Sequence, residues 1–256
     1  MSEGQGAKVR RSVGTRQLDS VDPFLMLDEF YVKAPAGFPD HPHRGFETVT
    51  YMLDGKFTHK DNKGHEGTIS VGDVQWMTAG RGIVHSEMPG TPEVNHGLQL
   101  WVNLPKAQKM KDPNYQELTK EQIPNYNKDG VTVRIIAGES YGIKAKVYTH
   151  IPITYLHVTL EKSATFEQAV PSNLDGFVYV LKGEGQFGKD SVAGKEGQLL
   201  MFDAGESLSV QTKEGVDFVL LSGKPIKEPV AKYGPFVMNT QEEIMQAMVD
   251  YRNGLF

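Results

Sequence analysis

Two short stretches decide how this chain folds and what it could bind, namely Gly37-Phe-Pro-Asp-His41-Pro-His43-Arg-Gly-Phe-Glu47 and Gly80-Arg-Gly82-Ile-Val-His85-Ser-Glu87. Successive side chains of an extended strand point to opposite faces, so residues two apart share a face at a separation of roughly 7 Å. His41 and His43 therefore share one strand face, and His85 and Glu87 share another. Two such pairs on facing strands could close around one ion.

The sequence beyond Phe46 alternates short apolar segments with turn residues. Glycine-containing turns such as Asp54-Gly55 and Gly72-Asp73 separate segments that are too short for helices. This close punctuation favours an antiparallel sandwich or barrel over alternating strands and helices. We therefore predict an all-β fold, with strands over 7–13, 21–30, 47–53, 56–60, 67–71, 74–78, 83–87 and 98–102.

Residues 104–126 are polar and include Pro105, Pro113 and Pro124. This segment is predicted to be a long connection with one helical turn, after which the strand pattern restarts at 131–137. We accordingly predict two domains, 1–127 and 128–256.

The second half of the chain repeats features of the first. Met52-Leu-Asp-Gly55 is echoed by Val180-Leu-Lys-Gly183, and the stretch 72–80 is echoed by 197–205. The first echo lies 128 residues further along the chain and the second 125 residues. At these offsets the positions that correspond to the candidate ligands are occupied by Ala169, Pro171, Val210 and Thr212. The repeat predicts a second, similar scaffold without metal ligands, and hence one metal ion per chain.

The tail carries the clearest helical pattern. Thr240 followed by Glu243 is a capping box, and an apolar stripe at helical spacing comprises Ile244, Ala247, Met248 and Tyr251. A short C-terminal helix is predicted, with these apolar side chains packed in the core.

Composition excludes several classes of function. The 256 residues include no cysteine, so disulfides, thiolate nucleophiles and iron–sulfur clusters are excluded. The net charge of -5 gives no direct nucleic-acid signal, and no apolar run is long enough for a signal peptide or a membrane span. We predict an intracellular protein, cytoplasmic or nuclear or both.

The candidate ligand set is three imidazoles and one carboxylate, which suits iron and also manganese, cobalt, nickel, copper or zinc. Glu47 lies four residues beyond His43, and it could be a ligand or an acceptor that orients an imidazole. The remaining histidines are interpreted as ordinary hydrogen-bonded side chains, with the first two in exposed turn sequence: His59, His65, His96, His150 and His157.

Four segments of this sequence together closely resemble the pirin family of the cupin superfamily, and the likeness extends over nearly the whole chain. They are Asp40-His-Pro-His-Arg-Gly-Phe-Glu47, Gln75-Trp-Met-Thr-Ala-Gly-Arg-Gly-Ile-Val-His-Ser-Glu-Met-Pro89, His96-Gly-Leu-Gln-Leu-Trp-Val-Asn103 and Tyr233-Gly-Pro-Phe-Val-Met-Asn-Thr240. The resemblance implies a bicupin, that is, two tandem jelly-roll type antiparallel barrels.

The resemblance also implies a metal site and two functions. It implies iron, Fe2+ or Fe3+, held in the first barrel by residues that match His41, His43, His85 and Glu87. Glu47, a ligand in the common cupin pattern, is then a neighbour of the ligands. Pirins of animals are nuclear co-regulators of transcription factors, and several pirins resemble quercetin 2,3-dioxygenase in activity.

The enzyme hypothesis is the opening of a flavonol ring by O2 with release of CO. Glu87 would act as the base for the substrate hydroxyl, and an apolar pocket for the flat substrate would include Phe38, Phe46 and Trp76. For Trp76 an ordinary place in the barrel core is an equally good interpretation.

The alternative hypothesis is a redox-sensing module that binds a transcription factor or another protein. Arg44 and Arg81 beside the ligands would supply positive surface, unless internal salt bridges occupy them, especially to Asp40 or Glu47.

Overall fold

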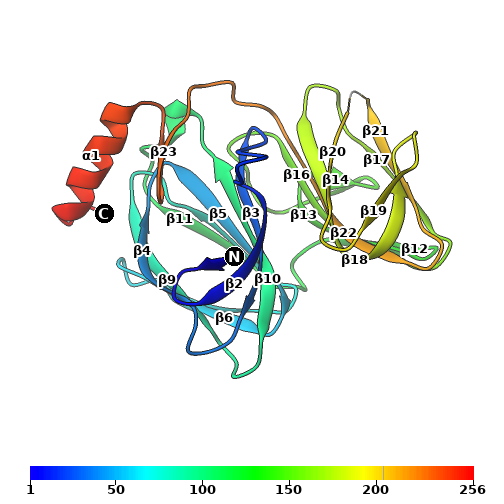
Figure 1. Ribbon diagram of the computed structural model, residues 1–256, viewed down its shortest axis with the longest axis horizontal. Coiled ribbons are helices and arrows are strands. Elements are labelled where there is room, and N and C mark those ends of the chain that lie inside the picture. Colours follow the sequence, from blue (N-terminus) through cyan, green and yellow to red (C-terminus); the bar gives the residue numbers. More distant parts are fainter. Residues whose placement is uncertain (204) are drawn as a thin grey trace. The chain divides into compact units, whose positions relative to one another are not determined.

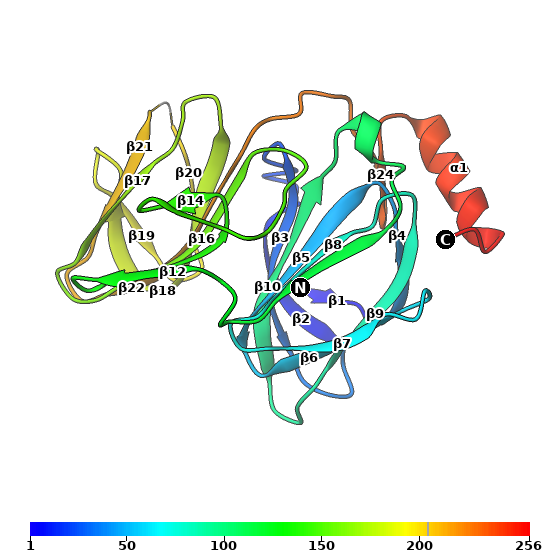
Figure 2. The ribbon, with the colours of Figure 1, turned by 180° about the vertical axis from the view of Figure 1, so that it is seen from behind.

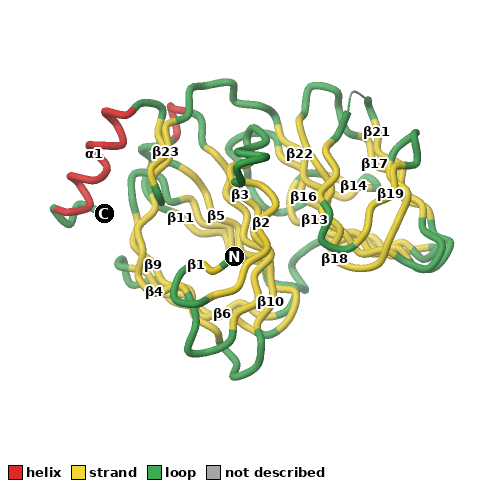
Figure 3. Tube along the Cα trace, in the orientation of Figure 1, coloured by secondary structure: helices red, strands yellow, loops and turns green. Residues whose placement is uncertain are grey.

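The computed structural model describes residues 1–203 and 205–256, and it divides into two compact units. The first unit comprises Met1–Lys120 together with Ile226–Phe256, and the second comprises Glu121–Pro225. Strands dominate the described residues of both units, and the helix lies in the C-terminal tail (Figures 1 and 3). The prediction of an all-β chain with a short C-terminal helix is therefore confirmed.

The first unit contains two large antiparallel sheets, whose strands can be followed in Figure 2. The one we call the first sheet has the strand order β1 (Ser2–Glu3), β2 (Ala7–Val13), β3 (Phe24–Val32), β10 (Asn95–Asn103), β5 (Phe46–Asp54), β8 (Val74–Thr78) and β11 (Asn114–Leu118). The histidine sheet has the order β4 (Phe38–His43), β9 (Ile83–Pro89), β6 (Lys56–Asp61) and β7 (Glu66–Ser70).

The two sheets face each other across an interior that is apolar at one end. There Phe30 of β3 lies 4.8 Å, between ring centroids, from Phe57 of β6, and both rings are buried together with Met52. Burying one such side chain contributes about 1.5–3 kcal/mol. These contacts help to hold the two sheets together.

The predicted connection over 104–126 is only partly right. It contains the expected helical turn, the 3-10 helix η1 (Lys106–Gln108), but also β11, which pairs with β8 at the edge of the first sheet. The sequence of β11, Asn114-Tyr-Gln-Glu-Leu118, is polar because an edge strand is partly exposed. Its apolar alternation is therefore too weak to recognise.

The second unit is a further antiparallel β structure. Its main sheet has the order β12 (Asn125–Lys128), β13 (Val131–Ala137), β16 (Ile153–Leu160), β22 (Val216–Gly223), β18 (Asp175–Phe187), β21 (Ser207–Gln211) and β17 (Thr165–Ala169). The shorter strands are β14 (Glu139–Ser140), β15 (Ile143–Lys144), β19 (Val192–Lys195) and β20 (Leu199–Met201).

The internal repeat seen in the sequence is also a repeat of backbone hydrogen bonds. In the first unit the amide of Gly72 donates to the carbonyl of Met52, and in the second the amide of Gly197 donates to that of Val180, both at 2.8 Å. Gly72 and Gly197 both have positive φ, 87° and 79°, which a residue with a side chain rarely adopts. Ala204, within the echoed stretch, lies outside the described residues.

The candidate ligand positions of the second unit are occupied as the sequence suggests. Val210 is fully buried in the apolar core of that unit. The hydroxyl of Thr212 donates to the carbonyl of Glu184 and accepts from the amide of Gly215. Both residues serve the scaffold.

The tail packs on the first unit, although the predicted boundary at 127/128 places it with the second domain. It forms the hairpin of β23 (Ala231–Tyr233) and β24 (Phe236–Met238), followed by α1 (Gln241–Arg252). The capping box is confirmed, since the Thr240 hydroxyl accepts from the Glu243 amide and the Glu243 carboxylate accepts from the Thr240 amide. Within the predicted stripe Ile244 and Ala247 are buried. No helix in the described part of the chain combines the length and the apolarity that crossing a membrane requires.

Candidate metal centre

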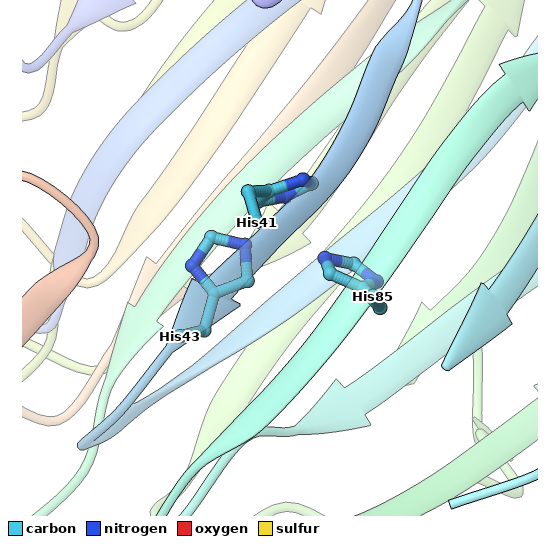
Figure 4. A group of neighbouring side chains, drawn as sticks. All are labelled: His41, His43 and His85. Carbon is cyan, nitrogen blue, oxygen red and sulfur yellow. The ribbon is translucent and has the colours of Figure 1, made fainter. Parts of the chain in front are cut away.

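Three histidine side chains converge inside the first unit (Figure 4). His41 of β4 is the register partner of His85 of β9, and His43 lies two residues further along β4. The ring centroids are 4.5 Å apart for His41 and His85, 4.7 Å for His41 and His43, and 5.0 Å for His43 and His85. One ring nitrogen of each lies within 4.8 Å of the others, so the three side chains could hold one metal ion.

The sequence of β4 explains how the two histidines are presented. β4 is an edge strand of the histidine sheet and carries Pro39 and Pro42. Proline has no amide hydrogen and is tolerated at a sheet edge. Strand alternation then puts His41 and His43 on the same interior face.

The protonation of the histidines suits metal binding. Burial, and then the proximity of His41, lowers the pKa of His43 and of His85 well below the ordinary 6.5, so both imidazoles are neutral at pH 7. Neither ring nitrogen of buried His85 has a hydrogen-bond partner among the described residues. The Nδ1 of His41 lies 2.8 Å from the carbonyl of Pro39, which assigns the proton to Nδ1 and leaves Nε2 for a ligand. These neutral and unpartnered nitrogens fit a bound transition metal.

Glu87 lies on the same face of β9 as His85, and its carboxylate is held by two side chains of the first sheet. Its Oε1 is 2.7 Å from the hydroxyl of Thr50, and its Oε2 accepts from the amide of Gln99 at 2.9 Å. The group of ligand atoms within 4.8 Å of one another consists of the three histidines and does not include Glu87. The assignment of Glu87 as a fourth ligand stays a prediction.

Thr50 and Gln99 belong to a polar row that crosses the interior face of the first sheet. Gln99, Thr50, Gln75 and Glu117 are successive register partners on β10, β5, β8 and β11, so they share one face. The row faces the histidine sheet. Gln75 and Gln99 lie in segments that resemble the family, whereas Thr50 and Glu117 carry no recognisable local signal.

Glu47 and Trp76 lie on the other face of the first sheet. Residues 46, 48 and 50 of β5 share the interior face, so alternation turns Glu47 away from it. The Glu47 carboxylate accepts from the hydroxyl of its register partner Thr78 at 2.7 Å. Trp76 is the register partner of Val49 and is fully buried on that same opposite face. Its position is that of a core residue, which is one of the two interpretations that the sequence left open.

The apolar wall beside the histidines combines one expected residue with one that was missed. The ring of Phe46 lies 5.1 Å from that of His43, and Trp101 of β10 lies 5.3 Å from it. Trp101 lies two residues after Gln99 in β10, so both side chains point to the same, interior face. This face can be identified only once the orientation of the whole sheet is known. Phe38 instead packs toward Phe57, at 6.4 Å between ring centroids.

The two arginines differ in exposure. Arg44 is buried: it donates to Asp250 of α1 at 2.6 Å and stacks on the ring of Phe256 at 4.3 Å. It therefore adds no exposed positive surface. The internal salt bridge is formed with Asp250 and not with Asp40 or Glu47, the partners that the sequence suggested. The side chain of Arg81 is 60% exposed and pairs with Asp112.

The remaining histidines mostly behave as expected. His96 lies 2.9 Å from Glu29, and His157 lies 2.7 Å from Asp217. The prediction that these two are hydrogen-bonded is confirmed. The prediction that His59 is exposed is wrong, because alternation in β6 turns its side chain into the interior, where it is 2% exposed.

Comparison with known proteins gives consistent matches over both halves of the chain. The family model "Pirin" matches residues 6–102, and "Pirin C-terminal cupin domain" matches residues 155–256. The pirin-like protein of Solanum lycopersicum is 57% identical over 256 residues, covering 99% of this chain and 88% of that protein. Pirin of Homo sapiens is 51% identical over 257 residues, covering 98% and 89%. The crystal structure of quercetin 2,3-dioxygenase from Acinetobacter baumannii superposes with a TM-score of 0.91 at 36% identity, covering 100% of this chain and 93% of that one.

Proposed function

Because this chain belongs to the pirin family of bicupins, we propose that it is a metal-dependent dioxygenase that opens the ring of a flavonol such as quercetin with O2 and releases CO. The observation that carries the proposal is the pair of buried, neutral imidazoles at His43 and His85, with the carboxylate of Glu87 on the same face. The likeness to a structure named quercetin 2,3-dioxygenase supports the choice of substrate.

His41, His43 and His85 would hold the metal ion, with Glu87 as the proposed fourth ligand. When bound, the ion supplies positive charge that stabilises a deprotonated flavonol and permits its electron exchange with O2. Iron is the proposed ion, and other divalent transition metals suit the same donors.

The residues around the ligands prepare a carboxylate for proton transfer. The carboxylate of Glu87 would accept the proton of the flavonol 3-hydroxyl. Thr50 and Gln99 fix the position of that carboxylate, each through one contact. The single hydroxyl proton of Thr50 can serve either Glu87 or the Gln99 carbonyl oxygen, which is also 2.7 Å away.

Phe46 and Trp101 would provide the apolar side of the substrate site. Both rings contact His43, and their own centroids are 4.4 Å apart. Such a wall suits a flat aromatic ligand better than a small polar one.

The test is an aerobic quercetin assay on protein of known metal content, following flavonol absorbance and CO release together. We expect consumption of quercetin that is lost in His43→Ala and His85→Ala and kept in His157→Ala, a matched substitution in the second unit. Iron-loaded protein that leaves quercetin unchanged while binding one ion at the histidines would refute the activity and keep the metal site.

That last outcome would favour the second hypothesis, a metal-dependent binding protein. Arg81, exposed and adjacent to the second motif, is the charged residue that such a surface offers. Affinity for a candidate transcription factor that differs between the Fe2+, Fe3+ and metal-free forms would support that role.

A further inference from the structure

A second group of ligand-type side chains lies in the same unit, apart from the three histidines. His59 of β6, His65 in the turn before β7 and Glu117 of β11 have ligand atoms within 4.8 Å of one another. The Oε1 of Glu117 is 2.9 Å from Nε2 of His59 and 3.1 Å from Nε2 of His65. The group joins the edge strand of the first sheet to the β6–β7 hairpin of the histidine sheet.

The turn that carries His65 is held in place by Asp61. One oxygen of the Asp61 carboxylate accepts from the backbone amides of Lys63 and His65, and the other accepts from the hydroxyl of Tyr115. The Tyr115 ring stacks on the His65 imidazole at 4.2 Å. His65 is therefore positioned before any ligand binds, although its side chain is 36% exposed.

His59 occupies a space that a glycine leaves open. A Cβ atom on Gly67 would come within 2.8 Å of Cε1 of His59. Neither ring nitrogen of the buried imidazole makes a hydrogen bond among the described residues, although Nε2 lies 2.9 Å from Oε1 of Glu117. The lack of a hydrogen bond at both nitrogens is unusual for a buried imidazole.

Glu117 is ionised at every physiological pH. The contact with His59, followed by hydrogen bonds from Gln75 and His65, lowers the pKa of Glu117 to about 2. The amide of Gln75 donates to Oε1 at 2.7 Å and orients the carboxylate. A carboxylate fixed in this way by a neighbouring side chain is typical of metal ligands.

We propose that His59, His65 and Glu117 form a second metal site, for a divalent ion of the zinc type. Two imidazole nitrogens and one carboxylate oxygen are the donors of known zinc sites that keep a further position open. The partial exposure of His65 and Glu117, 36% and 35% of their side chains, gives a solvent molecule access to that position. The bound ion would connect β11 to the β6–β7 hairpin, so its first effect is on stability. The site shares no ligand with the three-histidine group and does not depend on the proposed dioxygenase activity.

The test counts ions in full-length protein. Chelator-treated protein is dialysed against Zn2+, and zinc per chain is measured by mass spectrometry, with far-UV circular dichroism to verify folding. In the His41→Ala/His85→Ala background, which disables the first group, we expect one zinc ion per chain. Adding His65→Ala should remove it, whereas adding His157→Ala should not.

The thermal unfolding midpoint gives a second readout. Zn2+ should raise the midpoint of the His41→Ala/His85→Ala protein and leave it unchanged once His65→Ala is added. In the otherwise unaltered chain, Glu117→Gln should weaken binding of one of two ions at least tenfold. If the double variant does not fold, the single variant His65→Ala is the test instead. It should lower the number of zinc ions per chain from two to one. No zinc in the folded double variant, or zinc that persists after His65→Ala, would overturn the proposal.

Discussion

Thr50 and Glu87 meet across the interior of the first unit, with the threonine hydroxyl 2.7 Å from the carboxylate. The two residues come from opposite sheets, so this contact fixes the carboxylate relative to the three histidines on its own sheet. The polar row of the first sheet thereby positions a carboxylate of the histidine sheet.

Thr50→Val, which keeps the shape of the side chain but removes its hydroxyl, should lower quercetin turnover by about tenfold, because loss of a residue that orients a ligand or base costs about 10–100-fold. Thr58→Val, on the exposed face of β6, is the matched control and should leave turnover unchanged. Steady-state kinetics on metal-quantified protein measure both. Equal rates for the two variants would contradict a positioning role.

The two candidate carboxylates make opposite predictions. Glu87→Gln should lower kcat by about 100-fold or more, as removal of a general base does. Glu47→Gln should leave kcat within about twofold of the unaltered protein, because strand alternation turns Glu47 to the other face of the sheet. A large loss in Glu47→Gln with Glu87→Gln active would reverse the assignment.

The chain has two tryptophans, one on each face of the first sheet, and they provide another matched pair. Trp101→Ala should raise the KM for quercetin by about tenfold with unchanged metal content, because it removes the apolar contact beside His43. Trp76→Phe should lower the unfolding midpoint without changing KM, since Trp76 is fully buried on the opposite face. A KM that responds to Trp76 and not to Trp101 would place the substrate elsewhere.

Asp250→Asn removes the partner of buried Arg44. Leaving a buried charge without its partner costs about 3 kcal/mol, so the free energy of unfolding should fall by about that amount. Asp190→Asn, at an exposed position, should change it by less than about 0.5 kcal/mol. Urea unfolding measures the difference, and equal effects would show that the ion pair does not hold the tail.

Lys109 predicts a dependence of stability on alkaline pH. Its ammonium is buried and donates to the carbonyls of Gly45 and Val237 and to the side chain of Asn103. Burial, opposed in part by nearby carboxylates, lowers its pKa from 10.5 to about 8. Between these two values the unfolded chain holds a proton that the folded protein has released, so the contribution of Lys109 to stability increases as pH rises through that window.

The full increase is on the order of 3 kcal/mol. The free energy of unfolding of the unaltered protein, minus that of Lys109→Met, should therefore rise from pH 8 to pH 10. Urea unfolding at a series of pH values tests this, and the subtraction removes the contribution of the tyrosines. A difference that stays flat or falls would show that Lys109 keeps its ordinary pKa.

The class of fold and the place of the histidines follow from local patterns. A spacing of two residues within a strand suffices to put His41 and His43 on one face. Turns that contain glycine, such as the one at Gly72, indicate an antiparallel structure. The repeat adds the second scaffold. Each of these features depends on residues close together in the sequence.

Residues that depend on long-range register could not be predicted in the same way. Glu117 reaches His59 only because the polar edge strand β11 pairs with β8, and Trp101 faces His43 only because of the parity of β10 within the sheet. The sequence around Glu117 and Trp101 does not indicate which face of their strands points to the interior. The contact between the tail and Arg44 is a similar case, since the whole second unit separates the two in the sequence.

A metal ion bound at the three histidines would link the lifetime of the protein to the supply of metal. Both ring nitrogens of buried His85 lack a hydrogen-bond partner among the described residues. Folding without an ion removes these nitrogens from water without forming a hydrogen bond in its place. The metal-free protein is therefore less stable than its apolar packing alone would make it. An ion at one hundred times its dissociation constant would add about 2.7 kcal/mol to the free energy of unfolding. Since unfolded chains are degraded, the abundance of this protein in a cell would rise and fall with the concentration of free metal.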